Sequence, residues 1–569
     1  MLGAAQTAHA APITWTGAVN NDWNIGANWD TGTPPVSTSD VISNSLPIVS
    51  LSGAGTETID SLAIGSSGRL DLNDTSRLNV TGDHGFSGND SQVFGQLRAQ
   101  QFSVIDISNA DHLFAAFGPL TVTDNAVVIN SAGNGGIGRM LVLDGTADVS
   151  GNGTFDDSGR FIAINSSINF TDSGSFINKG FGAKFENGSG SIVNIHSAQG
   201  FENAQSALYE ILFDGKLNIN NGGRFLNRTG ATSRQNTSNT VTTIDGNGLF
   251  DNDSNVNLDI GTLNIGSTGV MSTSLRYTQN GDTLNVLSGG KFENTGGAFS
   301  ATLNGGTFRV HVGGDVVNDS TGFGLGGIII DGANVIVDGE SVPGGTGTFV
   351  QTSGTTTING QMIQTGVTIN GGALTGEGFI RGNVVNTGGT VGPGTSPGKL
   401  TTEDDFTQGP GGTLAIEIDS LSLFDILAIQ GAADLDGTLD LQVDAGYAAS
   451  AQDGDTFTII EWASFSGAFA TVSGLNFGIG KFFTLDYGTS GLTLTVGSET
   501  VIGRVRTRHD CPAWPRPRRY WLRTTQTRCL TPTTGSYLKR RSFQAPFFVC
   551  ACPLPVKSNR SCNSPAASA

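Results

Sequence analysis

A short repeat constrains the fold of this chain more than any other feature. Its frame is an apolar alternation, a glycine corner, a second alternation and a closing asparagine, and the clearest copy spans residues 217–227. The frame recurs at residues 168–178, 284–294 and 308–318. Its closing Asn or Asp positions are 157, 178, 203, 227, 252, 294 and 318, spaced by 21, 25, 24, 25, 42 and 24 residues, where 42 equals two periods of 21. A period in this range predicts a solenoid.

Each part of the repeat has a physical role. Leu217, Ile219 and Phe225 are placed to face one interior, because residues two apart share a face of a strand. The Gly-Gly pair permits positive φ at a corner, and asparagine tolerates the same region. Two short strands cannot bury their inward side chains alone, but about ten stacked coils can. We therefore predict an all-β, right-handed parallel β-helix; a sandwich of ordinary hairpins is the alternative and would give irregular spacing.

Composition agrees with short strands and tight turns. Glycine contributes 83 of 569 residues, and only 14% of residues are charged. We divide the chain into a signal-peptide remnant (1–11), a Trp-rich cap (12–50), the β-helix (51–400), a closing all-β module (401–497) and an anomalous tail (498–569).

The net charge of −19 combines two regions of opposite sign. Residues 501–569 hold 13 of the 30 Lys and Arg but 1 of the 49 Asp and Glu, so the tail carries +12 and residues 1–500 carry −31. An acidic body argues against nucleic acid as a partner, because phosphate binding needs clustered basic residues. All five cysteines also lie in the tail, and a cysteine-free body is compatible with an exported bacterial protein.

The N-terminal region has two features of its own. Ala8-His9-Ala10 is typical of a signal-peptidase site, although the basic start and apolar run are missing, so the segment is a truncated signal or an Ala-rich terminus. Trp15, Trp23 and Trp29 are expected to cover the open end of the solenoid; a sugar-stacking platform is the alternative.

Two stretches resemble known families. The opening around Trp15, Trp23 and Trp29 resembles exported bacterial β-helix proteins, including those with a Pro-Glu-Pro-type sorting signal (PEP-CTERM). The turn with Pro393-Gly394 and Pro397-Gly398 resembles the end of an autotransporter passenger β-helix, and this resemblance covers about residues 370–497. It implies that the module after the turn helps the β-helix to fold.

The closing module and the tail differ sharply. Residues 401–497 alternate strictly in seven short strands, which suits an antiparallel sandwich or a tapering β-roll that covers the lower end. Residues 498–569 lose the alternation and hold eight of the 17 prolines. The tail is a genuine basic segment or the product of a shifted reading frame. It contains neither a Pro-Glu-Pro signal nor a barrel, so we expect membrane attachment only through a segment missing from this chain.

No residues form a convincing catalytic, cofactor-binding or metal site in the sequence. The acidic clusters Asp156-Asp157 and Glu403-Asp404-Asp405 fall at expected turns, where acids are usually solvated or capping. The remaining candidates fail by type or spacing: isolated His84, His112, His196 and His311; Asp251–Asn255, which begins like a calcium loop but has Val256 and Thr262 where glycine and glutamate belong; and Gly345-Thr-Gly347, which lacks the lysine of a phosphate loop.

These observations favour a non-catalytic, exported structural or adhesin-like protein of the cell surface, outer membrane or extracellular space. We expect it to be monomeric, to need no cofactor, and to contact surface polysaccharide or a host or neighbouring cell. The alternative is a β-helix that binds or degrades polysaccharide, as a lyase or glycoside hydrolase. Three or more acids or aromatic residues converging on one face of neighbouring coils would favour that alternative.

Overall fold

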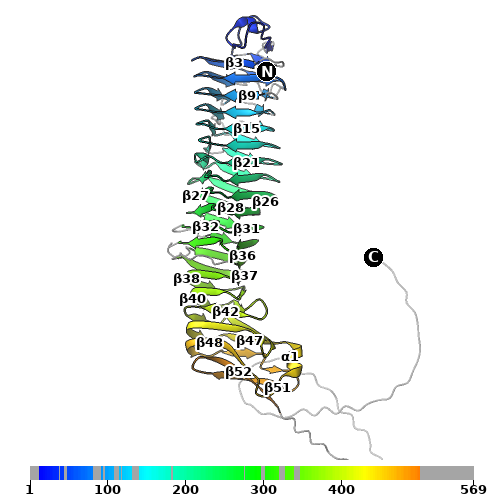
Figure 1. Cartoon of the computed structure of the whole chain (residues 1–569), viewed down its shortest axis with the longest axis vertical. Helices are drawn as coiled ribbons and strands as arrows, with labels where there is room; N and C mark the ends of the chain where they lie inside the picture. The colour runs from blue at the N-terminus through cyan, green and yellow to red at the C-terminus, as the bar shows by residue number, and fades with distance from the viewer. Residues whose placement is uncertain are drawn as a thin grey trace, which may run out of the picture. The chain divides into compact units, whose positions relative to one another are not determined.

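The chain folds into a parallel β-solenoid of about 15 turns. The computed structural model describes residues 12–499 except 38, 44–47, 81–90, 94–95, 108–113, 117, 131–139, 181–182, 275, 296–300, 320–326 and 339–346. Figure 1 shows the coils stacked one below another from the N-terminal end to the hairpins around β51 and β52. The predicted fold class is confirmed.

Each coil of the upper part of the solenoid has three strands, one on each of three faces, and strands on one face pair in parallel with those of the next coil. The first face holds β1 (Ile13–Thr14), β2 (Asp40–Ser43), β5 (Ser61–Ile64), β8 (Ser91–Val93), β11 (Phe114–Ala116), β14 (Met140–Leu143), β17 (Arg160–Ala163), β20 (Lys184–Asn187), β23 (Leu208–Ile211), the first halves of β26 (Thr232–Ile244) and β28 (Asn255–Ile265), β30 (Arg276–Gln279), β33 (Ala301–Leu303) and the start of β36 (Gly327–Val337).

The second face holds β3 (Ile48–Leu51), β6 (Arg69–Leu72), β9 (Gln96–Ala99), β12 (Leu120–Val122), β15 (Thr146–Val149), β18 (Ser167–Phe170), β21 (Ile192–Ile195), β24 (Lys216–Ile219), the second halves of β26, β28 and β36, β31 (Thr283–Val286) and β34 (Thr307–Val310). The third face is a separate sheet of β4 (Thr56–Ile59), β7 (Arg77–Val80), β10 (Val104–Asp106), β13 (Val127–Asn130), β16 (Thr154–Asp157), β19 (Ser175–Lys179), β22 (Gly200–Ala204), β25 (Arg224–Asn227), β27 (Leu249–Asn252), β29 (Val270–Thr273), β32 (Lys291–Asn294) and β35 (Asp315–Asn318).

The sequence repeat describes two of these three strands. Leu217 and Ile219 of β24 and Phe225 of β25 are buried, as the alternation predicts. The strand that completes the same coil is the first half of β26, which was not predicted. Its inward side chains are polar, because Ser233 and Gln235 are both buried. Without apolar alternation, the sequence pattern gave no signal for this strand.

The two glycines of the corner do different work. Gly222 has φ 81°, and its equivalents Gly289 and Gly313 have 77° and 78°, as predicted for the corner. Gly223 is needed for close packing instead, since a Cβ there would lie 1.9 Å from the Ile195 carbonyl oxygen of the preceding coil. The pair thus bends the chain and lets neighbouring coils approach.

Aromatic side chains fill the core of the regular region. Five rings stack along the third face with centroid separations of 4.6–5.1 Å, those of Phe155, Phe176, Phe201, Phe225 and Phe250. A second row on the first face meets them edge to face, formed by Phe161, Phe185 and Tyr209. Stacked and edge-to-face contacts are the two favourable geometries for aromatic rings. The core is therefore ordered in register with the coils.

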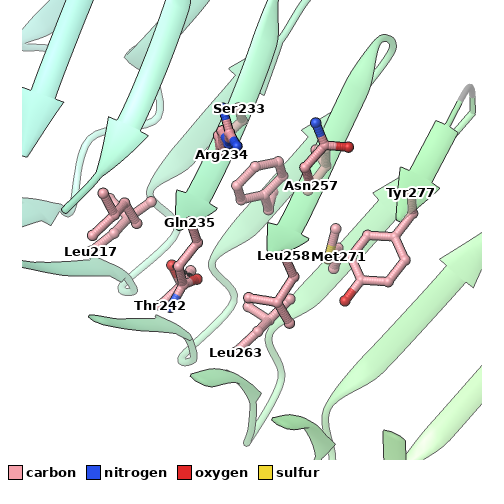
Figure 2. A pocket seen from close by; sticks show the side chains of 13 residues that line it. Leu217, Ser233, Arg234, Gln235, Thr242, Asn257, Leu258, Leu263, Met271 and Tyr277 are labelled. Carbon is pink, nitrogen blue, oxygen red and sulfur yellow. Dashed lines mark hydrogen bonds between the residues drawn. The ribbon is translucent and has the colours of Figure 1, made fainter. Parts of the chain in front are cut away.

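The core is less tightly filled where this stacking ends. Met271 and Tyr277 follow Phe250, and a cavity of about 20 Å³ lies among them and the strands β24, β26 and β28 (Figure 2). That volume is close to the space of one water molecule. Burial raises the pKa of the Tyr277 hydroxyl far above its ordinary value. The cavity is thus a packing defect at the change of core residues and is too small for an organic ligand.

The closing residues of the repeat form a buried polar column, which we call the asparagine ladder. Its rungs occupy matching positions on the third face and are fully buried: Asn130, Asp157, Asn178, Asn203, Asn227, Asn252, Thr273, Asn294 and Asn318. Asn203 Nδ2, for example, donates to Asn227 Oδ1 at 2.9 Å and to the Thr232 carbonyl at 2.8 Å. None of these rungs has positive φ. Positive φ is found at Asn221 of the corner (51°), but the closing asparagine does not serve the corner in this way, because its amide ties successive coils together.

Below residue 347 the coils become shorter and lead into the closing module. Thr348 pairs with Gly366, a period of 18 residues. The strands are β37 (Thr348–Ile358), β38 (Gln361–Ile369), β39 (Ala373–Gly376), β40 (Phe379–Asn386), β41 (Thr390–Pro393), β42 (Lys399–Thr402), β43 (Phe406–Gln408), β44 (Thr413–Ser420), β45 (Leu423–Phe424), β46 (Ile426–Leu435), β47 (Thr438–Val443), β48 (Thr456–Gly467), β49 (Thr471–Ser473), β50 (Asn476–Phe477), β51 (Lys481–Tyr487) and β52 (Gly491–Ser498).

Parallel stacking continues across residue 400 as far as β49. Antiparallel pairs join only β44 to β45, β48 to β52, β50 to β51 and β51 to β52 among the described strands. Of the two forms expected for residues 401–497, the tapering roll describes this arrangement and the antiparallel sandwich does not. The helix α1 (Ala445–Ser450) is capped by Asp444, whose Oδ1 accepts from Gly446 N at 2.7 Å.

At the other end, the tryptophans form a compact cluster beside the 3-10 turn η1 (Gly26–Asn28). The Trp29 ring meets those of Trp15 and Trp23 edge to face at 4.9 and 4.8 Å, and all three side chains are at most 3% exposed. A sugar-stacking platform needs an exposed ring face, so their burial favours the cap. Within the described residues, no helix is long and apolar enough to cross a membrane. The predictions for residues 1–11 and 500–569 lie outside the described part.

Candidate functional site at the Pro-Gly corner

The corner between β41 and β42 has the most unusual local geometry of the lower solenoid. Gly394 and Gly376 exchange backbone hydrogen bonds at 2.7 and 2.9 Å, which turns the chain sharply after Pro393. Ser396 has φ 98°, a left-handed conformation that side chains other than glycine rarely adopt. A strained residue persists only where its surroundings hold it.

Two side chains of the corner donate to carboxylates on neighbouring coils. Thr395 Oγ1 donates to Glu377 Oε1 at 3.0 Å, and Ser396 Oγ donates to Glu417 Oε2 at 2.7 Å. Glu377 precedes β40, whereas Glu417 lies on β44 in the next coil. The strained serine is thereby tied by its own hydroxyl to the coil below.

Two further carboxylates hold the end of the corner. Asp425 accepts from Gly398 N and Glu417 N, both at 2.8 Å, and Lys399 Nζ lies 2.7 Å from Glu461 Oε2. Asp425 is 2% exposed, and its burial raises its pKa to about 6. Four carboxylates distant in the sequence thus hold residues 395–399, and we call this arrangement the corner clasp.

Two hollows flank the corner clasp. The smaller one has a volume of about 330 Å³ and is lined by Thr390, Ser396, Glu417 and Asp425, among others. The larger one has a volume of about 450 Å³ and lies beside Lys399 and Glu461. Its lining includes the side chains Lys399, Gln430, Glu461, Trp462 and Ser490.

The smaller hollow contains a pair of carboxylates, the pattern that acid–base catalysis on glycosides requires. Their environment gives them another role. Both oxygens of Asp425 accept backbone N–H groups, and Glu417 accepts the Ser396 hydroxyl. A carboxyl engaged in this way stabilises the corner, and its elevated pKa follows from burial. The arrangement therefore resembles a structural clasp more than an acid–base pair.

The larger hollow is continued by a row of aromatic rings. Trp462 and Phe465 stack with centroids 4.6 Å apart, and Phe465 and Tyr487 with centroids 5.9 Å apart. Phe465 is 37% exposed, whereas Trp462 is 5% exposed. The ion pair of Lys399 with Glu461 leaves this hollow without net charge at its polar rim. Phe465 is the exposed ring of this row, Tyr487 is half-buried and Trp462 is buried, so the row meets only in part the criterion of three aromatic residues converging on one face.

A second charged surface lies higher on the first face. Lys184 Nζ bridges Glu186 and Glu210 at 2.7 and 2.6 Å, and Arg160 and Arg234 extend the row at 2.7 and 3.9 Å. Glu186 and Glu210 are almost fully buried beneath the basic side chains. Arg234 also pairs with Asp259 at 2.6 Å, so three basic and three acidic side chains balance and the row presents no excess charge to a ligand.

The acids singled out from the sequence are not brought together. Asp156 pairs with Lys179 at 2.8 Å on the outer surface. Asp157 ends β16 and is fully buried in the asparagine ladder, so the prediction that it lies at a solvated turn is wrong. Asp157 points into the core because residues two apart in a strand share a face, and Phe155 lies on the buried face of β16.

The remaining acidic candidates serve local structure. Asp404 and Asp405 accept backbone N–H groups of Gly382 and Ala432 at 2.9 and 2.8 Å, while Glu403 pairs with Arg381. Their capping role is confirmed.

The side chains of Asp251–Asn255, the stretch that begins like a calcium loop, also make structural contacts. Asn252 is a ladder rung, and Asp251 and Asp253 flank Arg228 at 3.7 and 2.9 Å. Within the described residues, no three His, Cys, Asp or Glu side chains are grouped to hold a metal ion.

The histidines do not form a site either. His311 Nε2 lies 3.3 Å from Asn285 Oδ1, and His311 is five coils below His196. His84, His112 and Gly345 lie outside the described residues. The corner clasp and its hollows were not predicted as a site, although the turn of 393–398 had been singled out.

No protein-family model matches this chain, and no curated protein is significantly similar to it.

Proposed function

We propose that this chain is a non-catalytic, exported surface protein of the structural or adhesin type, similar in organisation to an autotransporter passenger. The observation that carries the proposal is the use of the repeated positions. In every clear copy they fill the core, turn the corner or form the asparagine ladder. The paired carboxylates of the lower solenoid are likewise engaged in the corner clasp. A rod of this kind supports spacing and adhesion, because stacking extends it by length.

The first test of this function is enzymatic. We expect the purified chain to leave a panel of neutral and uronic-acid polysaccharides at full length, measured by size-exclusion chromatography and reducing-end release. Reproducible cleavage that disappears in Glu417→Gln would contradict a non-catalytic role and assign an acid–base function to the smaller hollow. Surface exposure is tested by protease shaving of cells that express the gene with its native flanking DNA; protection equal to that of a cytoplasmic marker would refute export.

A second function, polysaccharide binding, is favoured by the aromatic row. Phe465, the exposed ring of the row, stacks on Trp462, and Trp462 lines a hollow whose charges cancel. Such a hollow suits a neutral sugar better than a uronate. Sugar rings stack on aromatic faces and donate hydroxyls to side chains such as Gln430 and Ser490. The expected ligand is therefore a neutral glycan of the cell surface or its surroundings.

The binding prediction rests on Phe465. Replacing it by alanine is expected to weaken binding of a neutral glycan about five- to tenfold, because a stacked ring contributes about 1 kcal/mol. Titration calorimetry or glycan-affinity electrophoresis measures the change. Phe102→Ala is the matched control, since Phe102 is 62% exposed and far from the hollow along the chain. Equal affinities in the wild type and both variants, or no binding to any neutral glycan, would rule out this surface.

A further inference from the structure

Asp157 interrupts the chemistry of the asparagine ladder. Each amide rung has an N–H to donate onward and an oxygen to accept from the rung before. Asn178, Asn203 and Asn227 each donate in the same direction, with N···O distances of 2.8–2.9 Å. Above Asp157, Asn130 Nδ2 donates to Asp157 Oδ1 at 2.6 Å in the same sense. An ionised carboxylate accepts only, so it has nothing to pass to the next rung.

Two oxygen atoms remain without a donor at this point in the structure. They are Asp157 Oδ2 and Asn178 Oδ1, both buried. Asp157 and Asn178 are direct partners in the parallel register of β16 and β19. Two unpaired acceptors on neighbouring rungs are unfavourable in a buried core, and a buried unpaired charge is more costly still. A single proton on Asp157 Oδ2 would remove both costs.

We propose that Asp157 is a protonated rung, whose Oδ2–H donates to Asn178 Oδ1, and that loss of this proton weakens the solenoid at the coil of β16. The neutral acid accepts from Asn130 at one oxygen and donates from the other, as an asparagine does with its oxygen and nitrogen. It is therefore the one rung whose hydrogen bond depends on pH. Beyond the proposed function, the solenoid would therefore contain one coil, that of β16, whose stacking weakens at alkaline pH.

The surrounding charges do not provide another explanation. Among the described residues of β13, which lies above Asp157, none is ionisable at 127–130. On β16 itself Asp156 points outward to Lys179 of β19, and Arg160 of β17 pairs with Glu186. The Asp157 carboxyl receives, besides the Asn130 amide, the Gly159 N–H at 3.3 Å. Burial raises the pKa of Asp157 to about 8, opposed by these two hydrogen bonds and aided by the charge of Asp156.

The direction of the pH effect follows from the raised pKa. Between the ordinary value of 3.8 and about 8, the folded chain keeps a proton that the unfolded chain releases. Stability from this group is therefore complete at low pH, falls as the pH rises through that window, and reaches its minimum above about pH 8. The unfolding equilibrium constant changes by up to tenfold per pH unit within the window.

The test is Asp157→Asn in the full chain, with Asp156→Asn as the control. The amide completes the ladder at every pH, so the denaturant midpoint of Asp157→Asn should exceed that of the wild type by an amount that grows from pH 5 to pH 8. Asp156→Asn should follow the wild type. The same gap between wild type and Asp157→Asn at pH 5 and pH 9 would overturn the proposal.

A spectroscopic measurement needs no stability change. The wild type at pH 7 should show the infrared C=O band of a buried carboxylic acid, which Asp157→Asn lacks and Asp156→Asn retains, and the band should disappear near pH 8. Amide exchange near residues 157 and 178 should accelerate over the same range in the wild type alone. Absence of the band at pH 7 in the wild type would equally refute a protonated rung.

Discussion

Replacing Phe201 by alanine should destabilise the solenoid by about 3–5 kcal/mol. The Phe201 ring stacks between Phe176 and Phe225, with centroids 4.9 and 5.0 Å away and nearly parallel planes. It also meets Phe185 and Tyr209 edge to face. Its removal opens a cavity that these flat rings can fill only by leaving the register of their own coils.

The unfolding of a solenoid is local, so the measurement must have positional resolution. Stability in stacked repeats is a sum of coil and interface contributions, and a single transition midpoint does not report it fully. Guanidinium unfolding gives the overall loss, and hydrogen exchange should show the fastest opening in β19, β22 and β25. Phe102→Ala, at an exposed ring, should change stability by less than about 0.5 kcal/mol. An evenly distributed acceleration of exchange along the chain would contradict this account.

Replacing Asn203 by alanine should cost about 3 kcal/mol although no apolar contact is lost. The substitution removes the bonds from Asn203 Nδ2 to Asn227 Oδ1 and the Thr232 carbonyl, and it removes the acceptor of Asn178 Nδ2. Asn178 and Asn227 are fully buried, so no water replaces their bonds to Asn203, whereas Thr232 is half-buried. Leaving buried polar groups unpaired carries their full desolvation cost.

Asn218 provides the matched comparison, because it belongs to an outward-facing row of amides. Its Nδ2 donates to Asn194 Oδ1 at 2.9 Å, a geometry like that in the ladder, but the side chain is only half-buried. Asn218→Ala should cost less than about 0.5 kcal/mol. Chemical denaturation of the two variants side by side measures the difference. Equal losses would show that burial of the ladder does not determine its contribution.

The sequence predicted those parts of the fold that repeat in residue type. Phe225 and the glycine pair 222–223 have the burial and the corner geometry that the frame indicated. The strand of each coil that lies on the first face was missed, because its inward residues change type. They change from Phe185 to Tyr209 and then to Ser233 and Gln235. A face without a constant apolar pattern carries no periodic signal, although its backbone still pairs with the coils on either side.

The corner clasp was beyond sequence analysis for a different reason. Four carboxylates bind the short loop of residues 395–399 because coil lengths vary between β39 and β48. They are those of Glu377, Glu417, Asp425 and Glu461. To predict these contacts from the sequence, the length of every intervening turn would have to be known. Asp157 is a simpler case, since its place at the end of the repeat frame shows that it replaces an asparagine. Only the structure shows that the position is dry and that the next oxygen lacks a donor.

The ladder also gives the solenoid a sense of direction. Because Asn178, Asn203 and Asn227 each donate towards the C-terminal side, the N-terminal end of the column finishes in an acceptor, and a coil added below an amide rung meets a free N–H. A chain that grows from its N-terminus thus presents a polar template to each coil as it emerges.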